Sequence, residues 1–516
     1  MLTPHVRLLL GAALLMVGAG CASVDFDSPK EVTCHKEDLN DTRMAQFVEP
    51  LVAGQPEGHS GFALQRDGVE ALAARILLAK GAEHTIDTQY YLITNDRVGK
   101  VFIGTLLEAA DRGVRVRLLL DDILAGGAYD DAVAALSSHP NFEVRIFNPF
   151  SSRGLRVQDG LFDFSRVNRR MHNKSFTVDN EITIIGGRNI ADEYFGARSD
   201  RNFGDADLMC IGPVVDDVSH MFDDYWNSRW AAPVGAFGKP VDNPEKKLEE
   251  LRKVLDANGA EIAQSIYGEA VKADIEMLVD EEDEGFYWAP YRLVYDPVSK
   301  IAGRGFKAGD GIAGQLHEEV QKATEEVLIV SPYFVPLKSG VEYLEELIGR
   351  GIRVRVVTNS LGANNHGIVH SGYMAYRKRM LQIGVELYEV KSHAHVVGVD
   401  RGWAGAALAT LHTKAFLVDR DTLFLGSFNW DPRSVDLNTE LGAVVYSEEM
   451  GHDVALVADD GIKKGTYRVK LGEKGGLEWW DESGPEPIVY TGEPDVGWWR
   501  KFTVNLGRML PIRKQL

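Results

Sequence analysis

Apolar and polar positions follow two rhythms along the first half of the chain. Apolar residues that recur every three to four positions predict helices, and short runs of β-branched and aromatic residues between them predict strands. The helical runs cover 69–80, 101–112 and 132–136, and the strand runs cover 85–93, 114–120 and 143–147. Gly113 follows the second run at a place where helices commonly end. Alternation of this kind predicts an α/β layered domain.

The second half of the chain repeats the same order. Its helical runs cover 316–324 and 341–350, and its strand runs cover 327–330, 352–357 and 385–388. The strand over 352–357 carries alternating arginines like the strand over 114–120. Two halves of similar order predict a duplicated fold, packed about a pseudo-twofold axis that brings equivalent edges to one interface.

Each half contains one copy of the same polar stretch. The stretches at 171–179 and 411–419 both read His-x-Lys followed by four residues and an Asp. Each is followed by an apolar run and a Gly-x-x-Asn, at 186–189 and 426–429. Their flanks predict strands, on which residues two apart face the same way. With the pseudo-twofold arrangement, the two stretches are expected to face each other across one cleft.

The residue types in this stretch suit an anionic phosphate. His172 lies beside Lys174 on one face, and His412 lies beside Lys414. A lysine supplies a fixed charge and a histidine supplies a nucleophile or a proton carrier. A metal is poorly served, because a charged lysine is no ligand. One such histidine alone would read equally well as a buried core residue, but two copies with matched flanks favour chemistry.

Composition and charge narrow the function classes. The chain has 516 residues, enough for two or more domains, and 45% of them are hydrophobic. The net charge of -20 argues against nucleic acid as a partner. It also fits poorly with an anionic membrane surface unless basic residues are locally clustered. Three cysteines are too few for a disulfide framework.

The N-terminus reads as an export signal. An apolar run over 8–17 is shorter than the roughly 20 residues that span a bilayer. The small residues 18–20 before Cys21 resemble a bacterial lipoprotein cleavage box, which implies a signal peptide over 1–21 and lipidation of Cys21. Gly18 departs from that box, so plain secretion and a retained anchor stay as alternatives. By the same resemblance, Ala22 and Ser23 favour a periplasm-facing anchor in the outer rather than the inner membrane.

The remaining boundaries follow from changes in composition. We expect a tether over 22–58, domains over 59–242 and 311–465, a charged connector over 243–310 and a C-terminal segment over 466–516. The connector contains a helical pattern over 244–257 and an acidic run over 280–284, and a lid is its alternative role. From Trp498 the chain has paired tryptophans and basic residues without acids, which is typical of a membrane-surface helix, with a docked helix as the alternative.

Together, the two motif copies resemble the phospholipase D superfamily, and more narrowly the bacterial cardiolipin synthases of the C-type. The stretches that resemble this branch are 147–150, 163–170, 187–190, 359–361 and 426–434. The resemblance implies two phospholipase D-like α/β/α sandwich domains and a reaction that needs no metal and no cofactor. One histidine attacks phosphorus and forms a phosphohistidine. The other protonates the leaving oxygen and then deprotonates the incoming alcohol or water.

The resemblance also implies individual roles. It favours His172 as the nucleophile, although the sequence alone does not separate the two histidines. The groups expected to bind phosphoryl oxygens or donate a hydroxyl are Lys174, Lys414, Asn189, Asn429 and Ser427. Gly187 replaces that hydroxyl in the first half, so the halves are unequal.

Each histidine also needs an acid on its other ring nitrogen. We expect Glu440 to serve the second half and Asp207, in preference to Asp205, to serve the first. Asp179 and Asp419 are expected to close strand ends.

Specificity residues are weaker predictions. Arg166, Arg169 and Arg170 lie just before His172 and would receive anionic headgroups, or else form a surface charge run. On one face of a predicted helix, His370 and Arg377 would line a headgroup pocket or simply pack. Tyr91 and Tyr333 at matching strand ends would form pocket walls.

The function expected from the resemblance is phosphatidyl transfer that forms cardiolipin from phosphatidylglycerol, with or without phosphatidylethanolamine. Hydrolysis by a phospholipase D-type phosphodiesterase is the alternative, because both reactions share the phosphohistidine and differ in the acceptor. A nuclease is disfavoured by the acidic balance. An inactive lipid-binding envelope protein is the alternative from another class.

Overall fold

The computed structural model describes residues 24–37, 39–124, 126–151, 153, 159, 163–236, 242–265, 267–273, 285–303, 305–392 and 408–507. The signal peptide and Cys21, the acidic run over 280–284 and the last residues of the basic C-terminus lie outside the described residues. In the described part, no helix has the length and apolar character needed to cross a membrane.

The first half forms a mixed sheet with helices on both faces. Along the sheet the strands are β9 (Ala231–Pro233), β4 (Phe142–Phe147), β3 (Arg115–Asp121), β2 (Thr85–Tyr90), β5 (Ser175–Val178), β6 (Ile182–Gly186), β8 (Asp207–Ile211) and β1 (His59–Gln65). One core lies between the sheet and the helices α3 (Gly68–Gly81), α4 (Arg97–Asp111) and α5 (Gly127–Leu136). On the other face lies α8 (Val214–Asn227).

The second half repeats this arrangement. Its strands run in the order β19 (Leu477–Asp481), β18 (Thr466–Leu471), β13 (Glu386–Val390), β12 (Arg353–Asn359), β11 (Glu326–Val330), β15 (Ala415–Val418), β16 (Thr422–Gly426) and β17 (Leu441–Tyr446). The helices α11 (Ile312–Gln321) and α12 (Leu337–Gly349) cover one face, and α16 (Glu448–Gly465) covers the other. The predicted duplicated α/β architecture is confirmed.

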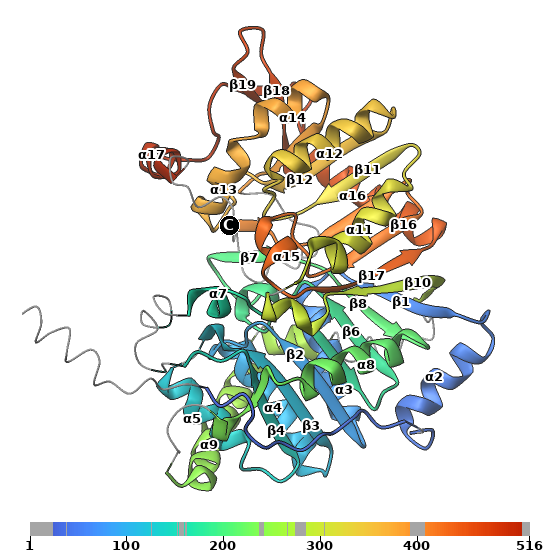
Figure 1. Cartoon of the computed structure of the whole chain (residues 1–516), viewed down its shortest axis with the longest axis vertical. Coiled ribbons are helices and arrows are strands. Elements are labelled where there is room, and N and C mark those ends of the chain that lie inside the picture. The colour runs from blue at the N-terminus through green and yellow to red at the C-terminus, as the bar shows by residue number, and fades with distance from the viewer. Residues whose placement is uncertain are drawn as a thin grey trace, which may run out of the picture.

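One strand joins the two half-sheets. The first part of β10 (Tyr287–Tyr295) pairs with β1, and its second part pairs with β17. Figure 1 shows the first half, blue to green, below the second half, yellow to red, with β10 at their junction. The sequence of β10 does not predict this role, because Pro290 in its middle has no N–H to donate to a neighbouring strand. Pro290 stands where the strand exchanges one partner for the other.

Two predicted boundaries therefore differ from the structure. The stretch over 243–310 holds β10 as well as α9 (Pro244–Ala263), which packs on α4 and α5. The charged residues of α9 favoured a solvated connector, but the apolar face of this helix packs into the core of the first half. Likewise β18 and β19, from the expected C-terminal segment, extend the second sheet at its edge. The chain then runs through β20 (Ile488–Tyr490) to α17 (Trp498–Gly507).

Asp179 and Asp419 occupy equivalent tight turns after the motif strands. Both have a left-handed backbone, with φ of 49° and 48°. The Asp179 carboxylate accepts three backbone N–H groups, from residues 83–85, at 2.8–2.9 Å. The Asp419 carboxylate accepts the N–H groups of residues 324–326 at 2.7–2.9 Å. Each aspartate thereby ties the turn to the start of the strand that pairs with its motif strand, β2 in the first half and β11 in the second.

Candidate active site

Each motif strand is fastened to the backbone of the other half. His172 N donates to Thr439 O at 2.8 Å, and Thr439 N donates to Arg170 O at 2.9 Å. In the second motif, His412 N donates to Gly204 O at 2.7 Å, where β14 (Leu408–Leu411) pairs with β7 (Arg201–Gly204). These exchanges across the interface place both histidines in one buried site, with 8% and 4% of their surfaces exposed.

The acids that hold the histidines are exchanged between the halves. His172 Nδ1 lies 2.7 Å from Glu440 Oε2, and His412 Nδ1 lies 2.5 Å from Asp205 Oδ2. The expected assignment of Glu440 to the second-half histidine, and of Asp207 to His172, is therefore corrected. The backbone hydrogen bonds across the interface explain this pairing. Thr439 and Gly204 come just before the two acids, and each is hydrogen-bonded to the motif of the opposite half.

Asp207 has another task. Its Oδ2 accepts from Arg75 Nη2 at 2.8 Å and from Arg188 Nη1 at 3.2 Å, and all three residues are buried. Arg188 also donates to the backbone oxygen of Asp205. This buried ion group fixes the turn that carries Asp205 and leaves the Asp207 carboxylate no contact with either histidine.

The surroundings of the two acids explain why only the second half has the motif hydroxyl of Ser427. Ser427 Oγ and Ser434 Oγ both donate to Glu440, the latter at 2.7 Å. In the first half, a Cβ on Gly187 would lie 2.2 Å from Asp205 Oδ1. A serine therefore has no room beside Asp205. The hydroxyl and glutamate together support His172, although they come from the His412 half of the chain.

Burial and charge set the protonation of the histidine–acid pairs. Burial lowers the pKa of His172, and burial together with the Lys414 charge lowers the pKa of His412 to about 3. Burial opposes ionisation of Asp205, but Lys414 and His412 outweigh it and lower its pKa to about 2. His172 likewise outweighs burial at Glu440 and lowers the pKa of that carboxyl. At neutral pH the site holds two neutral imidazoles on two carboxylates.

Both lysines are fully enclosed. Lys174 Nζ donates to His172 O at 2.5 Å, and Lys414 Nζ donates to His412 O and lies 3.6 Å from Asp205 Oδ2. Burial lowers the pKa of Lys174 to about 7 and also lowers that of Lys414, although the nearby carboxylates oppose both shifts. An anion that enters the site would reverse part of this shift, because it stabilises the ammonium form.

The two motif asparagines are both buried. Asn189 Nδ2 donates to Tyr194 Oη at 2.9 Å. The side-chain oxygens of Asn189 and Asn429 are buried and have no hydrogen-bond partner among the described residues. Such groups are costly unless a ligand or water satisfies them, so both amides are available to a bound molecule.

Aromatic rings enclose both histidines. Tyr91 meets the His172 ring edge-on at 5.1 Å, and Tyr333 meets the His412 ring at 6.3 Å. Two further rings escaped the sequence prediction. Phe203 stacks on His412 at 5.2 Å with 10° between the planes, and the Tyr194 hydroxyl lies 3.5 Å from His412 Nε2. Both lie between motif and acid in the sequence, in a stretch with no pattern that marks them.

The three arginines expected to receive anionic headgroups form hydrogen bonds within the protein instead. Arg166 donates to Asp163 and to Pro149 O. Arg169 donates to the backbone oxygens of residues 300 and 436. Arg170 donates to Asn148 O at 2.6 Å and lies 3.4 Å from Asp121. The cluster therefore holds the chain before His172 in place. Its guanidinium groups donate to backbone oxygens of other segments, and the sequence alone does not predict these contacts.

Of the two roles expected for His370 and Arg377, the structure shows packing. The predicted single helix is two, α13 (Gly367–Met374) and α14 (Arg377–Ile383), with a break between them. Arg377 is fully buried and contacts Glu389 at 3.2 Å, Glu493 at 2.8 Å and His370 Nε2 at 3.1 Å. These charges neutralise one another inside the second half rather than lining a headgroup pocket.

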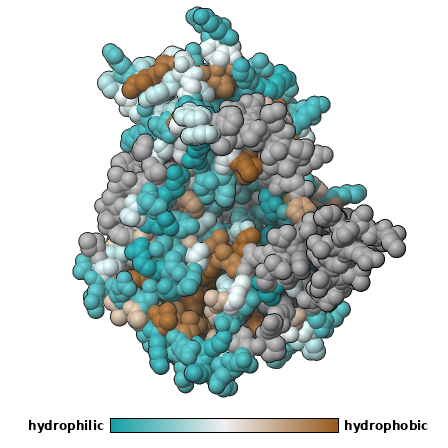
Figure 2. Space-filling view, turned by 90° about the vertical axis from the view of Figure 1, so that its left-hand side faces the viewer, coloured by the Kyte–Doolittle hydropathy of each residue, from teal (hydrophilic) through white to brown (hydrophobic). Residues whose placement is uncertain are grey.

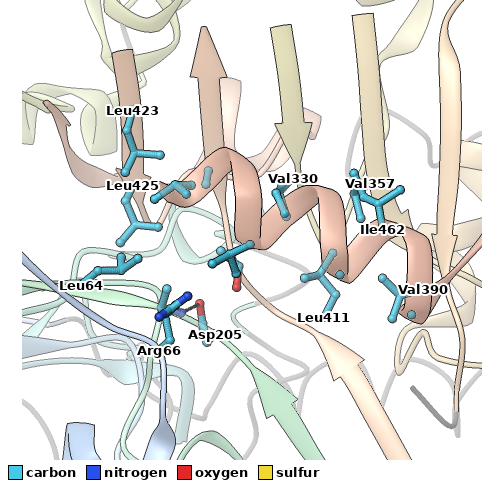
Figure 3. Close-up of a pocket in the computed structure, with 18 of the residues that line it drawn as sticks. Leu64, Arg66, Asp205, Val330, Val357, Val390, Leu411, Leu423, Leu425 and Ile462 are labelled. Carbon is cyan, nitrogen blue, oxygen red and sulfur yellow. Dashed lines mark hydrogen bonds between the residues drawn. The ribbon is translucent and has the colours of Figure 1, made fainter. Parts of the chain in front are cut away.

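An apolar cavity of about 190 Å³ lies behind the second motif, under α16. Figure 3 shows α16 crossing the strand ends, with Leu423, Leu425 and Val330 pointing into the space beneath it. Leu411, which precedes His412, and Asp205 border the same cavity. Asp205 and Arg66 are the charged residues among those that line this largely apolar cavity.

Comparison with known proteins agrees with this geometry. The family model described as "Cardiolipin synthase, PLD-like domain" matches residues 76–226 and 316–457, so each matched stretch contains one motif. The chain belongs to this family. The resemblance noted from the motifs is therefore confirmed.

Relatives match over nearly the whole chain. Cardiolipin synthase C of Escherichia coli (strain K12) is 39% identical over 481 residues, covering 91% of this chain and 99% of that protein. An uncharacterized protein of Helicobacter pylori (strain J99) is 30% identical over 505 residues, covering 96% and 97%. The crystal structure of phosphatidylserine synthase from Haemophilus influenzae Rd KW20 has a TM-score of 0.54 at 14% identity, covering 83% and 92%, and shows the same fold.

Proposed function

We propose that the chain is a phosphatidyltransferase that forms cardiolipin through a phosphohistidine intermediate. The observation that carries the proposal is the exchanged pairing, in which each half supplies the acid for the histidine of the other. Two neutral imidazoles, each on an ionised carboxylate and beside a lysine, suit one phosphodiester held between them. Similarity to cardiolipin synthase C over nearly the whole chain supports the lipid substrates.

In the first step, His172 Nε2 attacks phosphorus and the bond to the leaving alkoxide breaks. When the anionic phosphodiester binds, its charge raises the pKa of His412, and His412 takes up a proton from solvent at Nε2. His412 then gives that proton to the leaving oxygen. The phosphorylated His172 becomes cationic, and Glu440 stabilises that charge. Glu440, which accepts from two serine hydroxyls, thus supports the histidine that carries the covalent intermediate.

In the second step, the hydroxyl of phosphatidylglycerol loses its proton to His412 and attacks phosphorus. The phosphorus–nitrogen bond breaks, His172 is restored, and cardiolipin leaves. The donor is phosphatidylglycerol, which releases glycerol, or phosphatidylethanolamine, which releases ethanolamine. The low exposure of both histidines favours an alcohol brought in by a lipid over free water.

Membrane contact through α17 is part of this proposal. Trp498 and Trp499 are 65% and 63% exposed and stack at 4.1 Å, while the helix packs on α13. Exposed tryptophans beside basic residues suit the membrane interface. Figure 2 shows the side of the molecule on which α17 lies, with hydrophobic patches among hydrophilic residues. Together with the lipid anchor expected at Cys21, this contact supports our proposal of a location in the bacterial cell envelope, facing the periplasm, at the outer membrane.

The test is a product assay with the purified full chain in mixed micelles of phosphatidylglycerol, with and without phosphatidylethanolamine, in the presence of EDTA. We expect cardiolipin, and its loss in His172→Ala and in His412→Ala. The matched control is His452→Ala, which removes an exposed histidine on α16 and should keep full activity. Phosphatidic acid as the sole product would replace the transferase by a hydrolase, and lipid binding without turnover would replace it by a binding protein.

A further inference from the structure

A short N-terminal segment lies against the first half, away from the motif strands. Thr33 O accepts from Arg117 Nη1 at 2.7 Å, and Thr33 Oγ1 accepts from Trp226 Nε1 at 2.9 Å. His35 N donates to Asp223 Oδ2 at 2.8 Å. The end of the expected tether is therefore docked on α8, which carries Trp226 and Asp223.

The His35 ring is held with one nitrogen in use and the other free. Its side chain is only 5% exposed, and Nδ1 lies 2.7 Å from Asp223 Oδ2. Because a carboxylate accepts and does not donate, Nδ1 carries the proton and Nε2 presents a lone pair. Nε2 is buried and makes no hydrogen bond within the described part of the chain. An unpartnered buried nitrogen of this kind calls for a ligand.

A second histidine and a carboxylate face that nitrogen. The His220 ring lies 4.6 Å from the His35 ring, and its Nδ1 lies 2.8 Å from Asp216 O, so its Nε2 is also left with a lone pair. His35 Nε2 lies 3.9 Å from Glu37 Oε1, too far for a hydrogen bond. One ligand atom from each of the three residues falls within 4.8 Å of the others. Residues 35 and 37 project to the same side of an extended chain.

We propose that His35, Glu37 and His220 bind one divalent transition metal ion of the zinc type, with water completing the coordination. Two neutral imidazoles and a carboxylate are ligands that zinc accepts in a four-coordinate site. Each imidazole has the second partner that metal-bound histidines usually have, a carboxylate for His35 and a backbone carbonyl for His220. The Glu37 side chain is 75% exposed and free to close the remaining distance.

The ion would pin the N-terminal segment to α8. Glu37 and His35 come from the segment and His220 comes from the helix, so the metal closes a link between parts far apart in the chain. A tether fixed at this point limits how far the catalytic halves can move from a lipid anchor. The site is separate from the proposed chemistry, which uses no metal, so activity in EDTA and zinc binding here are independent outcomes.

Zinc binding to the purified full chain, stripped with EDTA and dialysed, tests the proposal by competition with a chromophoric zinc chelator. We expect one Zn²⁺ per chain at this site and at least a tenfold weaker affinity in His220→Ala and in Glu37→Gln. Both residues are exposed, so neither change threatens folding. His452→Ala should bind zinc like the parent. Equal affinity in all four proteins, or no binding in the parent, would overturn the site.

Trypsin gives a second measurement, because exposed Lys36 lies between two of the proposed ligands. Cleavage needs the segment to leave α8, so zinc should slow cutting after Lys36 by tenfold or more in the parent. The same zinc should leave the rate unchanged in His220→Ala. Protection that persists in that variant, or no protection in the parent, would show that zinc does not link the segment to the helix.

Discussion

Replacing Glu440 by Gln removes one negative charge from behind His172 while keeping the shape of a fully buried side chain. The carboxylate accepts from two serine hydroxyls and pairs with His172 Nδ1 at 2.7 Å. In the proposed reaction His172 becomes cationic when it attacks phosphorus. Glu440→Gln therefore weakens a charge interaction that is strongest in the transition state and the covalent intermediate.

The size of the effect follows from this geometry. A nitrogen–oxygen distance of 2.7 Å places the centres of the two charges about 4 Å apart. At an effective dielectric constant of about 20, two such charges attract by about 4 kcal/mol. Since about 1.4 kcal/mol corresponds to a factor of ten in rate, kcat/KM should fall about 1,000-fold.

The assay is cardiolipin formation in phosphatidylglycerol micelles, with the melting temperature of each protein measured alongside. The matched control is Glu389→Gln, the same change at another glutamate with no exposed surface. Glu389 serves the Arg377 ion group, so this control should lower the melting temperature and keep kcat/KM within severalfold of the parent.

Histidine NMR tests the exchanged pairing directly. In ¹⁵N-labelled protein, Glu440→Gln should shift the ring nitrogen signals of His172 and leave those of His412 in place, and Asp205→Asn should do the reverse. A kcat/KM within tenfold of the parent in a folded Glu440→Gln protein would refute the role of the acid. A shift confined to His412 would refute the pairing itself.

Four further predictions test other parts of the structure. Asp207→Asn breaks a buried ion group and should lower the free energy of unfolding in urea by about 3–5 kcal/mol, so an unchanged urea midpoint would contradict its structural role. Because the pKa of Lys174 is lowered to about 7, its ammonium form is lost as the pH rises above 7. Inhibition by vanadate should therefore weaken from pH 7 to 9 in the parent but not in Lys174→Met, and a flat profile in the parent would count against a titrating lysine. Tyr194→Phe removes one hydrogen bond and should lower kcat/KM about five- to tenfold, equivalent to about 1–1.4 kcal/mol, whereas full activity would leave this hydroxyl no part in the reaction. Changing Trp498 and Trp499 together to Ser should reduce sedimentation with phosphatidylglycerol vesicles about tenfold and spare turnover of a short-chain soluble substrate, and unchanged sedimentation would remove α17 from the membrane contact.

The sequence determined the features that depend on neighbouring residues. Helix and strand periodicity placed most elements within a few residues, because the pattern reports which face of a local segment is buried. His172 and Lys174 could be put on one face for the same reason. Duplication of the stretch then implied two halves and one site, and the family comparison confirms the fold.

Tertiary structure alone decided which groups meet. Glu440 lies near Ser427 in the chain, yet it supports His172, because the backbone at Thr439 is hydrogen-bonded to the opposite motif. The Arg166–Arg170 cluster looks free in the sequence, but backbone oxygens from distant segments surround it. A strand pattern gives the direction of a side chain and not its partner. Partners across an interface depend on how the two halves pack against each other, and no local periodicity records that.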